Sequence, residues 1–391
     1  MAGKGRERRG TLTVNGRVEI TRRRWYLKGS GSCTPLDTLV DAAEAAVSVG
    51  SRELCCRLNA DSRSFARAAE NLKRAAGMAI SSESLRQVVE EEGGRVLRLA
   101  ASGKLAPVWK ATECRAQTPG GRGATRVYLG SDGFTMPLVT DAEKRLRRRK
   151  VNQKRQKRGR KVRKLGPVKK GADQRYKEAK VVVFYDQTME HRQVAVTRGD
   201  CEAAGLLMRR DAQRLDFHLA DERVGNIDGG PWIIRQVDKH LEMTAVGLDI
   251  FHLGENVHQG RRLTFGEEDQ AGQAWAGEML HTVKHEGYEP LWEGLMEWRK
   301  GQRGIKRREA DRLIHYVSDR REMIRYPEFI AKGWQIGSGP TESQCRVVPD
   351  RVKGSGMRWD ADNAEAIMAL EAMEQSNQWS EYWKIALAQR N

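Results

Sequence analysis

Apolar and polar residues alternate near the start of the chain and then give way to helical spacing. Residues 10–22 alternate on either side of Asn15-Gly16, which predicts a β-hairpin. From residue 38 to residue 101, apolar positions recur with the period of helices. The helices expected there are 38–49 after the cap Asp37, one capped by Ser51, 65–76, and one from Ser84 after a turn at Gly77. This outline is typical of a helix-turn-helix DNA-binding module, although an ordinary helical bundle has the same pattern.

Short apolar runs replace the helical pattern from residue 125 onward. The expected strands are 125–139, 177–185, 191–197, 223–228 and 244–249, with helices at 201–214 and 231–239. This order predicts an α/β fold in which three antiparallel strands precede two αβ crossovers. Residues 253–333 keep helical spacing throughout and are too long for a connection, so we expect a large all-α insertion there. A further helix is expected from Pro340.

The positive charge of the chain is concentrated in two places. The formal net charge is +18, and residues 144–177 contain 18 Lys or Arg and one acid. Residues 1–28 contain nine basic residues and two acids, so the rest of the chain is mildly acidic. Because like charges repel and few apolar residues can be buried, we expect the basic arm, residues 141–177, to be disordered on its own. Its charge favours contact with nucleic-acid phosphates over the role of a solvated linker.

Length and composition exclude several classes of protein. A chain of 391 residues with 39% hydrophobic residues predicts two or three packed domains. Apolar runs are too short for a transmembrane helix and the N-terminus lacks a signal-peptide core, so we expect a soluble, cytoplasmic protein. The six cysteines are too few for a disulfide scaffold. Cys33 has no paired knuckle and Cys55-Cys56 are adjacent, so no zinc is expected.

Three acidic residues lie where strands end or a helix begins. Asp132 lies in or near the end of a strand, Asp228 ends another, and Glu342 lies in the first turn of a helix. Carboxylates brought together in this way suit Mg²⁺ or Mn²⁺, and two such ions would serve phosphodiester chemistry. Asp249 also ends a strand and is a rival for the second position. Turn formation by Asp228 and helix capping by Asp249 are the structural alternatives.

The order of these motifs resembles the DDE transposases of bacterial insertion sequences, in particular the mutator-like group. One shared feature is Asp249-Ile-Phe-His252 ahead of a helical insertion. Another is Ile336-Gly-Ser-Gly-Pro-Thr-Glu342, followed by residues 353–359, which is similar to the glutamate helix of the ISKra-type members. The resemblance covers residues 125–391. It implies an RNase H-like mixed sheet core with an all-α insertion. The helical pattern of residues 38–101 adds a preceding α-helical DNA-binding domain to the expected fold.

The patterns along the chain and the resemblance together give a domain plan and roles for individual residues. The plan is a basic hairpin segment 1–36, a helical DNA-binding domain 37–101, a linker 102–124 and a catalytic domain 125–391. Asp132, Asp228 and Glu342 would be the catalytic, metal-binding triad for two Mg²⁺ or Mn²⁺ ions, supported by Asp249 and His252. Residues expected to bind DNA are Arg147, Arg148, Arg149, Lys154, Arg155, Lys157, Arg158, Lys161, Arg346, Lys353 and Arg358, with Arg351 beside them.

The implied function is metal-dependent cleavage at element ends and transesterification into target DNA. Its partners would be double-stranded DNA, as terminal inverted repeats and target, and further copies of the chain in a synaptic complex. A structure-specific DNA nuclease and a domesticated, non-catalytic DNA-binding derivative are the alternatives.

The remaining candidates have simpler interpretations. His281 and His285 share a helix face but lack a third metal ligand, so we expect surface histidines. We expect the tryptophans of the insertion to pack its helices, Asp186 to form a hairpin turn, and Cys201 and Cys345 to fill space; the tryptophans are Trp275, Trp292 and Trp298.

Overall fold

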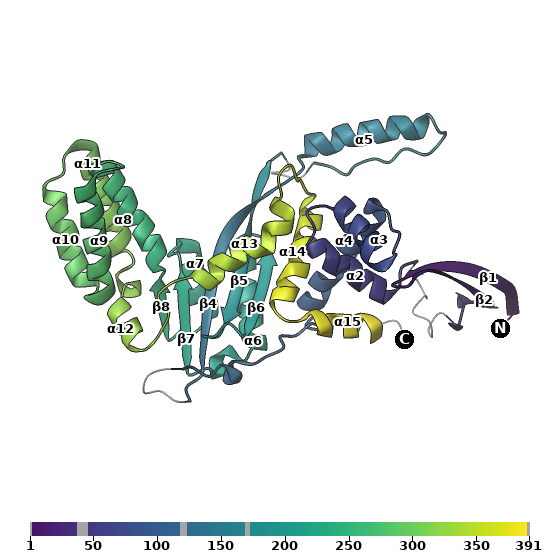
Figure 1. The fold of residues 1–391 in the computed structure, drawn as a ribbon, viewed down its shortest axis with the longest axis horizontal. Helices are drawn as coiled ribbons and strands as arrows, with labels where there is room; N and C mark the ends of the chain where they lie inside the picture. The colour runs from purple at the N-terminus through teal and green to yellow at the C-terminus, as the bar shows by residue number, and fades with distance from the viewer. Residues whose placement is uncertain (1, 37–45, 118–122, 169–172, 389–391) are drawn as a thin grey trace. The chain divides into compact units, whose positions relative to one another are not determined.

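The computed structural model describes residues 2–36, 46–117, 123–168 and 173–388 (Figure 1). These residues form two compact units, each built from separate stretches of the chain. The sheet unit contains residues 109–134 and 180–345, and the helical unit contains residues 1–108, 135–179 and 346–391. None of the helices in the described part of the chain combines the length and apolar character needed to cross a lipid bilayer.

A five-stranded mixed sheet forms the centre of the sheet unit. Its strands are β4 (Arg126–Pro137), β5 (Tyr176–Tyr185), β6 (Arg192–Thr197), β7 (Glu222–Ile227) and β8 (Ala245–Leu248). Their order across the sheet is β6-β5-β4-β7-β8, with β5 and β6 antiparallel and both β4–β7 and β7–β8 parallel. The five predicted strands and the α/β class are therefore confirmed.

Two helices connect the later strands, one between β6 and β7 and one between the parallel strands β7 and β8. They are α6 (Cys201–Arg214) and α7 (Pro231–His240), and they pack against each other. The Asp200 side chain caps α6, and Pro231 occupies the first turn of α7, where its missing N–H costs nothing. Val127, Leu129 and Phe184 are fully buried between these layers. The predicted crossover helices are confirmed.

The insertion after β8 is helical, as predicted. Its helices are α8 (Ile250–Thr264), α9 (Gln270–His285), α10 (Tyr288–Lys300), α11 (Gly304–Ser318) and α12 (Tyr326–Ala331). The Trp275 and Trp298 ring centroids lie 4.6 Å apart inside the bundle, and Trp292 stacks on Tyr288. These tryptophans pack the insertion, which confirms the structural interpretation.

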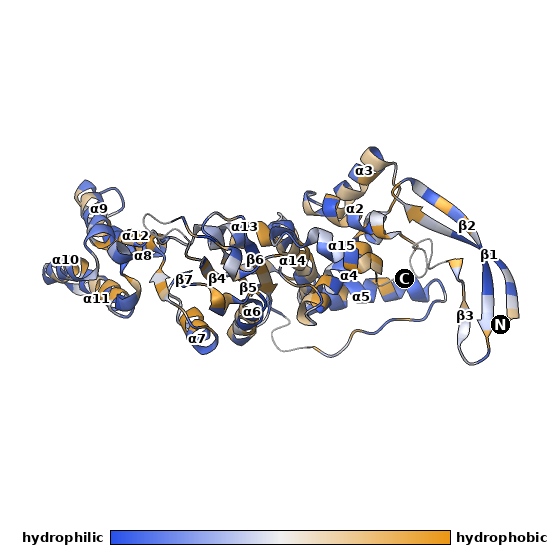
Figure 2. Ribbon diagram, turned by 90° about the horizontal axis from the view of Figure 1, so that it is seen from below, coloured by the Kyte–Doolittle hydropathy of each residue, from blue (hydrophilic) through white to orange (hydrophobic). Residues whose placement is uncertain are grey.

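The helical unit begins with the predicted hairpin, formed by β1 (Ala2–Thr13) and β2 (Gly16–Leu27) and extended by β3 (Gly31–Cys33). Thr13 pairs with Gly16, whose φ of +100° lies in the left-handed region that this tight turn requires. Hydrophilic residues occupy much of the hairpin (Figure 2).

Three helices follow: α2 (Val49–Ala60), α3 (Phe65–Ala76) and α4 (Ser82–Ala101). The predicted helix 65–76 is confirmed. The expected cap Ser51 was wrong, because the Ser48 side chain accepts the hydrogen bond from the Ser51 N–H and caps α2. The helix expected at 38–49 lies mostly outside the described residues, and residues 46–48 are not helical.

The end of the chain packs with these helices. The later elements are α13 (Gly339–Lys353), whose first turns belong to the sheet unit, α14 (Ala361–Gln375) and α15 (Trp379–Ala388). A Cβ atom at Gly93 of α4 would lie 2.1 Å from the carbonyl oxygen of Ala366 in α14, so the two backbones are in close contact. This bundle therefore draws on residues that the expected plan places in the catalytic domain.

The basic arm contains a helix, so the expectation of disorder was wrong for its first part. Helix α5 spans Asp141–Gln156. Thr140 and Glu143 form a capping box at its start, and Arg145 pairs with Asp141 one turn earlier. Lys and Arg are also good helix formers, so the repeated charge does not prevent the helix.

The segment expected as a linker, residues 102–124, is partly built into the sheet unit. Trp109, Ala111 and Cys114 are buried in its core, around the short 3-10 helix η1 (Ala111–Glu113). The Trp109 indole N–H donates to the carbonyl oxygen of Arg192, 3.1 Å away. Residues 109–114 therefore anchor this segment to β6.

Candidate active site

Four acidic residues lie on neighbouring elements of the sheet unit. Asp132 lies within β4, and Asp228 and Asp249 directly follow β7 and β8. Glu342 lies in the first turn of α13. Because β4, β7 and β8 are adjacent and parallel, the residues that follow β7 and β8 lie at the same edge of the sheet.

Asp249 is the most buried of these acids, and hydrogen bonds surround its carboxylate. It caps α8 by accepting from the His252 backbone N–H at 3.2 Å. It also accepts from His252 Nδ1 at 2.6 Å and from the Ser338 backbone N–H at 2.9 Å. Burial raises the pKa of Asp249, but the hydrogen bonds from His252 and Ser338 outweigh burial and lower it. Asp249 is therefore held as an anion by protein groups.

His252 lies close to both Asp249 and Glu342. One ligand atom each of Asp249, His252 and Glu342 lies within 4.8 Å of the others. The hydrogen bond with Asp249 raises the pKa of His252 to about 9 against the effect of burial, and the charge of Asp228 contributes in the same direction. The imidazole is therefore a cation among carboxylates at neutral pH.

Asp132 and Asp228 are near enough to repel each other. Burial raises the pKa of Asp132, and the carboxylate of Asp228 raises it further. The Gly133 N–H at 2.6 Å, the Cys345 thiol at 3.5 Å and His252 oppose this shift. Asp228 accepts from the Gly230 N–H at 2.7 Å, which is the turn role considered for it.

A small residue brings the Glu342 helix against the strand that carries Asp132. A Cβ atom at Gly130 would lie 1.7 Å from Thr341 Oγ1, so the start of α13 touches β4 two residues before Asp132. Glu342 is exposed, and Ser338 Oγ lies 3.5 Å from its carboxylate. This contact shows how Glu342 is brought to the edge of the sheet that carries the other acids.

Some contributors were not found from the sequence. Cys345 was expected only to fill space, yet its thiol donates to Asp132. Ser338 bonds both Asp249 and Glu342, and Arg320 donates from Nη2 to the Gly229 carbonyl oxygen at 2.8 Å, next to Asp228. Apart from the contact between Ser338 and Glu342, these contacts join residues distant in sequence, so no local motif predicts them.

The expected DNA-binding residues lie mostly on exposed surface. Those of the arm lie on α5 or just after it, and Arg346, Lys353 and Arg358 are exposed on or after α13. Arg351 is a correction: it is 6% exposed, bonds the Asn59 side chain at 3.1 Å and lies against Phe65 and Trp359. It stabilises the bundle and is not available to phosphates.

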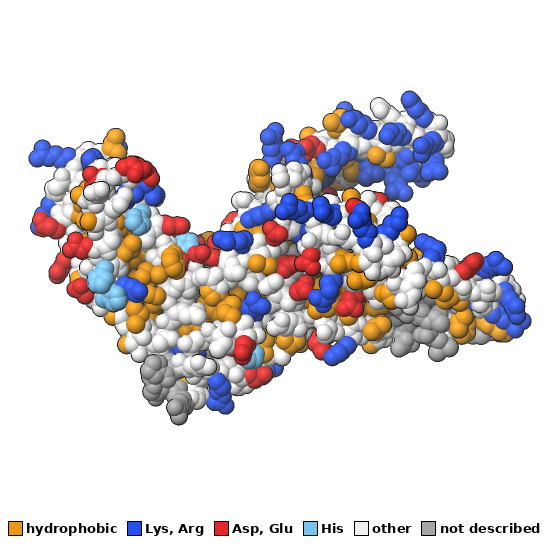
Figure 3. All heavy atoms as spheres, in the orientation of Figure 1, with side chains coloured by type: hydrophobic (Ala, Val, Ile, Leu, Met, Phe, Trp, Pro, Cys, Tyr) orange, Lys and Arg blue, Asp and Glu red, His pale blue; other side chains and the backbone are white. Residues whose placement is uncertain are grey.

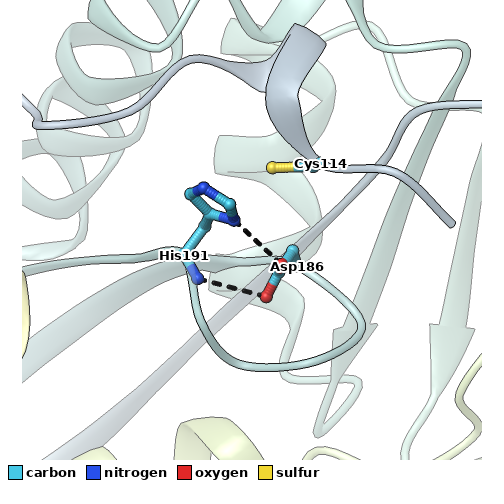
Figure 4. Close-up of side chains that lie close together, drawn as sticks. All are labelled: Cys114, Asp186 and His191. Atoms are coloured by element: carbon cyan, nitrogen blue, oxygen red, sulfur yellow. Dashed lines mark hydrogen bonds and ion pairs between the residues drawn. The ribbon is translucent and has the colours of Figure 1, made fainter.

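A second group of possible ligands consists of Asp186 and His191 at the β5–β6 turn and Cys114, which follows η1 (Figure 4). Asp186 accepts from His191 Nδ1 at 3.0 Å and from Thr188 Oγ1 at 2.8 Å, which confirms its turn role. Burial, followed by the charge of Asp186, raises the pKa of the Cys114 thiol to about 12. These hydrogen bonds hold the β5–β6 turn in place, so the group is explained by a structural role.

No protein-family model matches the chain, and no curated protein was found to match it. A functional interpretation therefore depends on the fold and on the geometry of the acidic site.

Proposed function

We propose that this protein is a DDE-type DNA transposase with an RNase H-like catalytic core. The strand order β6-β5-β4-β7-β8 supports this assignment, with β5 and β6 antiparallel and β7 parallel to both β4 and β8. So does the helical insertion between β8 and the glutamate helix. The helical DNA-binding domain is part of the same proposal, although α4 is largely packed against α14 and its Arg86 is paired with Glu83 and Glu90.

The observation that carries the proposal is a group of acids near His252, two of them within ligand distance of it and two coupled to it by charge. Asp132 and Asp228 influence each other electrostatically, both influence His252, and His252 adjoins Asp249 and Glu342. Clustered carboxylates of like charge oppose folding unless a cation balances them. Acids with perturbed pKa values at the carboxyl ends of parallel strands are typical of an active or ligand-binding site.

The donor set fits Mg²⁺ or Mn²⁺. Carboxylate oxygens are the ligands these cations prefer, and the mutual repulsion of Asp132 and Asp228 is what a divalent cation would relieve. In this proposal Asp132, Asp228 and Glu342 would hold the ions, whereas the group whose ligand atoms lie within 4.8 Å of one another is Asp249, His252 and Glu342. The chemistry that two such ions supply when bound is activation of the attacking oxygen and stabilisation of the leaving oxygen.

Asp249 and His252 act as positioning residues in this proposal. Asp249 already accepts three hydrogen bonds from the protein, so it is better suited to orient His252 than to serve as the second ligand. Asp228 is accordingly preferred as that ligand. Protonated His252 places a positive charge among the acids, next to the position of a scissile phosphate.

The proposed partner is double-stranded DNA, as element ends and as target. The cations of α5 and of the segment after it would bind the phosphate backbone. The exposed Arg346, Lys353 and Arg358, on or after α13, would do the same. Joining two ends requires more than one copy of the chain, so a dimer or larger synaptic complex belongs to the proposal. The protein would act in the cytoplasm, on nucleoid DNA.

The test is cleavage of labelled DNA that carries the boundaries of the encoding element, with Mg²⁺ present. We expect Asp132→Asn, Asp228→Asn and Glu342→Gln each to reduce cleavage by at least about 100-fold. Asp238→Asn, an exposed acid on α7, is the matched control and should retain activity. If all three site variants cleave normally, the triad is wrongly assigned.

The products separate the alternatives. Joined strand-transfer products identify a transposase, whereas cleavage without joining identifies a structure-specific nuclease. Binding without cleavage by the wild-type protein identifies a non-catalytic derivative.

A further inference from the structure

A large groove lies beside the acidic site, within the sheet unit. Its volume is about 1170 Å³, and it is lined mainly by one face each of α8 and α9 together with Ile336 and Gly337. Phe251, Glu255, His258 and Arg262 follow one another at helical spacing along the α8 side. The volume exceeds that of most small-molecule sites, which suggests an extended ligand.

The lining is basic with an apolar component. Arg261, Arg262 and Lys284 contribute cations, whereas Glu255 contributes one carboxylate. His281 and His285 lie on the α9 side and are exposed, which confirms them as surface histidines. Figure 3 shows histidine side chains beside an apolar strip over the insertion helices. This mixture fits a ligand that has both phosphates and flat apolar groups.

Phe251 is unusual in its exposure. Its side chain is 65% exposed although it lies in the first turn of a well-packed helix, two residues from Asp249. A Cβ atom at Gly337 would lie 3.2 Å from the Phe251 ring, so the ring lies over the backbone next to Ser338. An aromatic face is thus presented to solvent at the end of the groove nearest the acidic site.

We propose that this groove binds an unpaired DNA strand, with a base stacked on Phe251 and phosphates held by Arg262 and Lys284. An exposed aromatic ring with adjacent cations is the combination that binds single strands, because every unpaired base offers a π face. Bases inside a duplex are already stacked on their neighbours. The inference rests on the proposed function, in which a strand is freed beside the acids, and it names where that strand is held.

The experiment measures binding without cleavage. The full chain is titrated, with Ca²⁺ in place of Mg²⁺, into a labelled unpaired DNA oligonucleotide containing 2-aminopurine. Anisotropy reports affinity and loss of 2-aminopurine fluorescence reports stacking. We expect Phe251→Ala to weaken binding about tenfold or more and to abolish the quenching, while Phe251→Trp retains both.

Matched controls separate stacking from general surface effects. Ile305 is a 70% exposed apolar residue on α11 outside the groove, so Ile305→Ala should bind like wild type. Arg262→Gln should weaken binding and reduce its salt dependence, whereas Arg308→Gln, an exposed change elsewhere on α11, should not.

Several outcomes would overturn the inference. These are wild-type affinity and quenching in Phe251→Ala, equal dependence on Phe251 for a duplex of the same length, or tighter binding of the corresponding RNA. Failure of the proposed function gives a different result. Phe251-dependent strand binding without any cleavage would support strand binding in the groove and contradict the transposase assignment. Normal cleavage together with unchanged strand affinity in Phe251→Ala would contradict only the strand-binding role of the groove.

Discussion

The surroundings of Asp132 disfavour the ionised form of its carboxyl group. Burial and the neighbouring Asp228 raise its pKa, so its ionised form is less stable in the folded protein than in the unfolded chain. We expect Asp132→Asn to raise the melting temperature in the absence of divalent metal while abolishing cleavage, because the amide keeps the bond from Gly133. Thermal unfolding with a chelator, beside the cleavage assay, measures both effects. A lower melting temperature would contradict this account.

Asp249, in contrast to Asp132, should stabilise the folded protein. Asp249→Ala removes the cap of α8 and the partner of His252, so we expect a loss of about 1–2 kcal/mol for the cap alone. Asp228→Ala removes one turn hydrogen bond and relieves repulsion of Asp132, so its stability should change much less. Denaturant unfolding of the two variants gives the comparison. Equal losses would mean that Asp249 has no special structural role.

At the scale of elements, adjacent glycines in α4 predict opposite effects. Gly93 touches the α14 backbone at Ala366, so Gly93→Ala should destabilise the protein by about 1–3 kcal/mol. Gly94 faces only the end of the flexible Arg98 side chain, so Gly94→Ala should stabilise it by about 0.5–1 kcal/mol. Denaturant midpoints decide the signs. Stabilisation by both variants would show that α4 and α14 are not closely packed.

The charges of α5 can be removed without removing the helix. Gln has a helix propensity close to those of Lys and Arg, so changing Arg147, Arg149 and Lys154 to Gln should leave the helix in place. Duplex DNA binding should weaken at every sequence, and the slope of log affinity against log salt should fall by about 0.9 for each phosphate that the protein no longer neutralises. The same changes at Lys300, Arg303 and Arg308 on the insertion serve as control. An unchanged salt slope would remove the arm from the DNA-binding surface.

The strands and most helices could be predicted because their signals are local. Buried apolar runs, Pro231 and the Asn15-Gly16 turn act within a few residues. Helix α5 was missed because its stability comes from a capping box and spaced ion pairs, whereas the overall composition suggested repulsion. In the site, the acids were recognisable by type and position. Their supports, Ser338 and Cys345, depend on contacts across the fold and leave no local pattern.

At the scale of the whole molecule, the helical unit depends on the end of the chain. Ending the chain at residue 360 removes α14 and α15, and with them the partner of α4 and the Tyr382 hydroxyl bonded to buried Glu92. We expect residues 49–101 to lose hydrogen-exchange protection while the strands β7 and β8 of the sheet unit keep theirs. Exchange mass spectrometry measures both regions in one sample. Unchanged protection of residues 49–101 would contradict a shared fold with α14.

The three-part make-up of the helical unit also has a consequence for how the protein is made. Residues 49–101 leave the ribosome early, yet the helix that covers α4 is translated almost last. At roughly 5–20 residues per second, the interval is on the order of tens of seconds. During that time the face of α4 that α14 covers has no native partner, although α2 and α3 already pack on α4. The last segment of the sheet unit is complete at residue 345, before α14 is synthesised. An incomplete chain released between residues 346 and 360 would therefore carry every residue of the acidic site together with an unfinished helical unit.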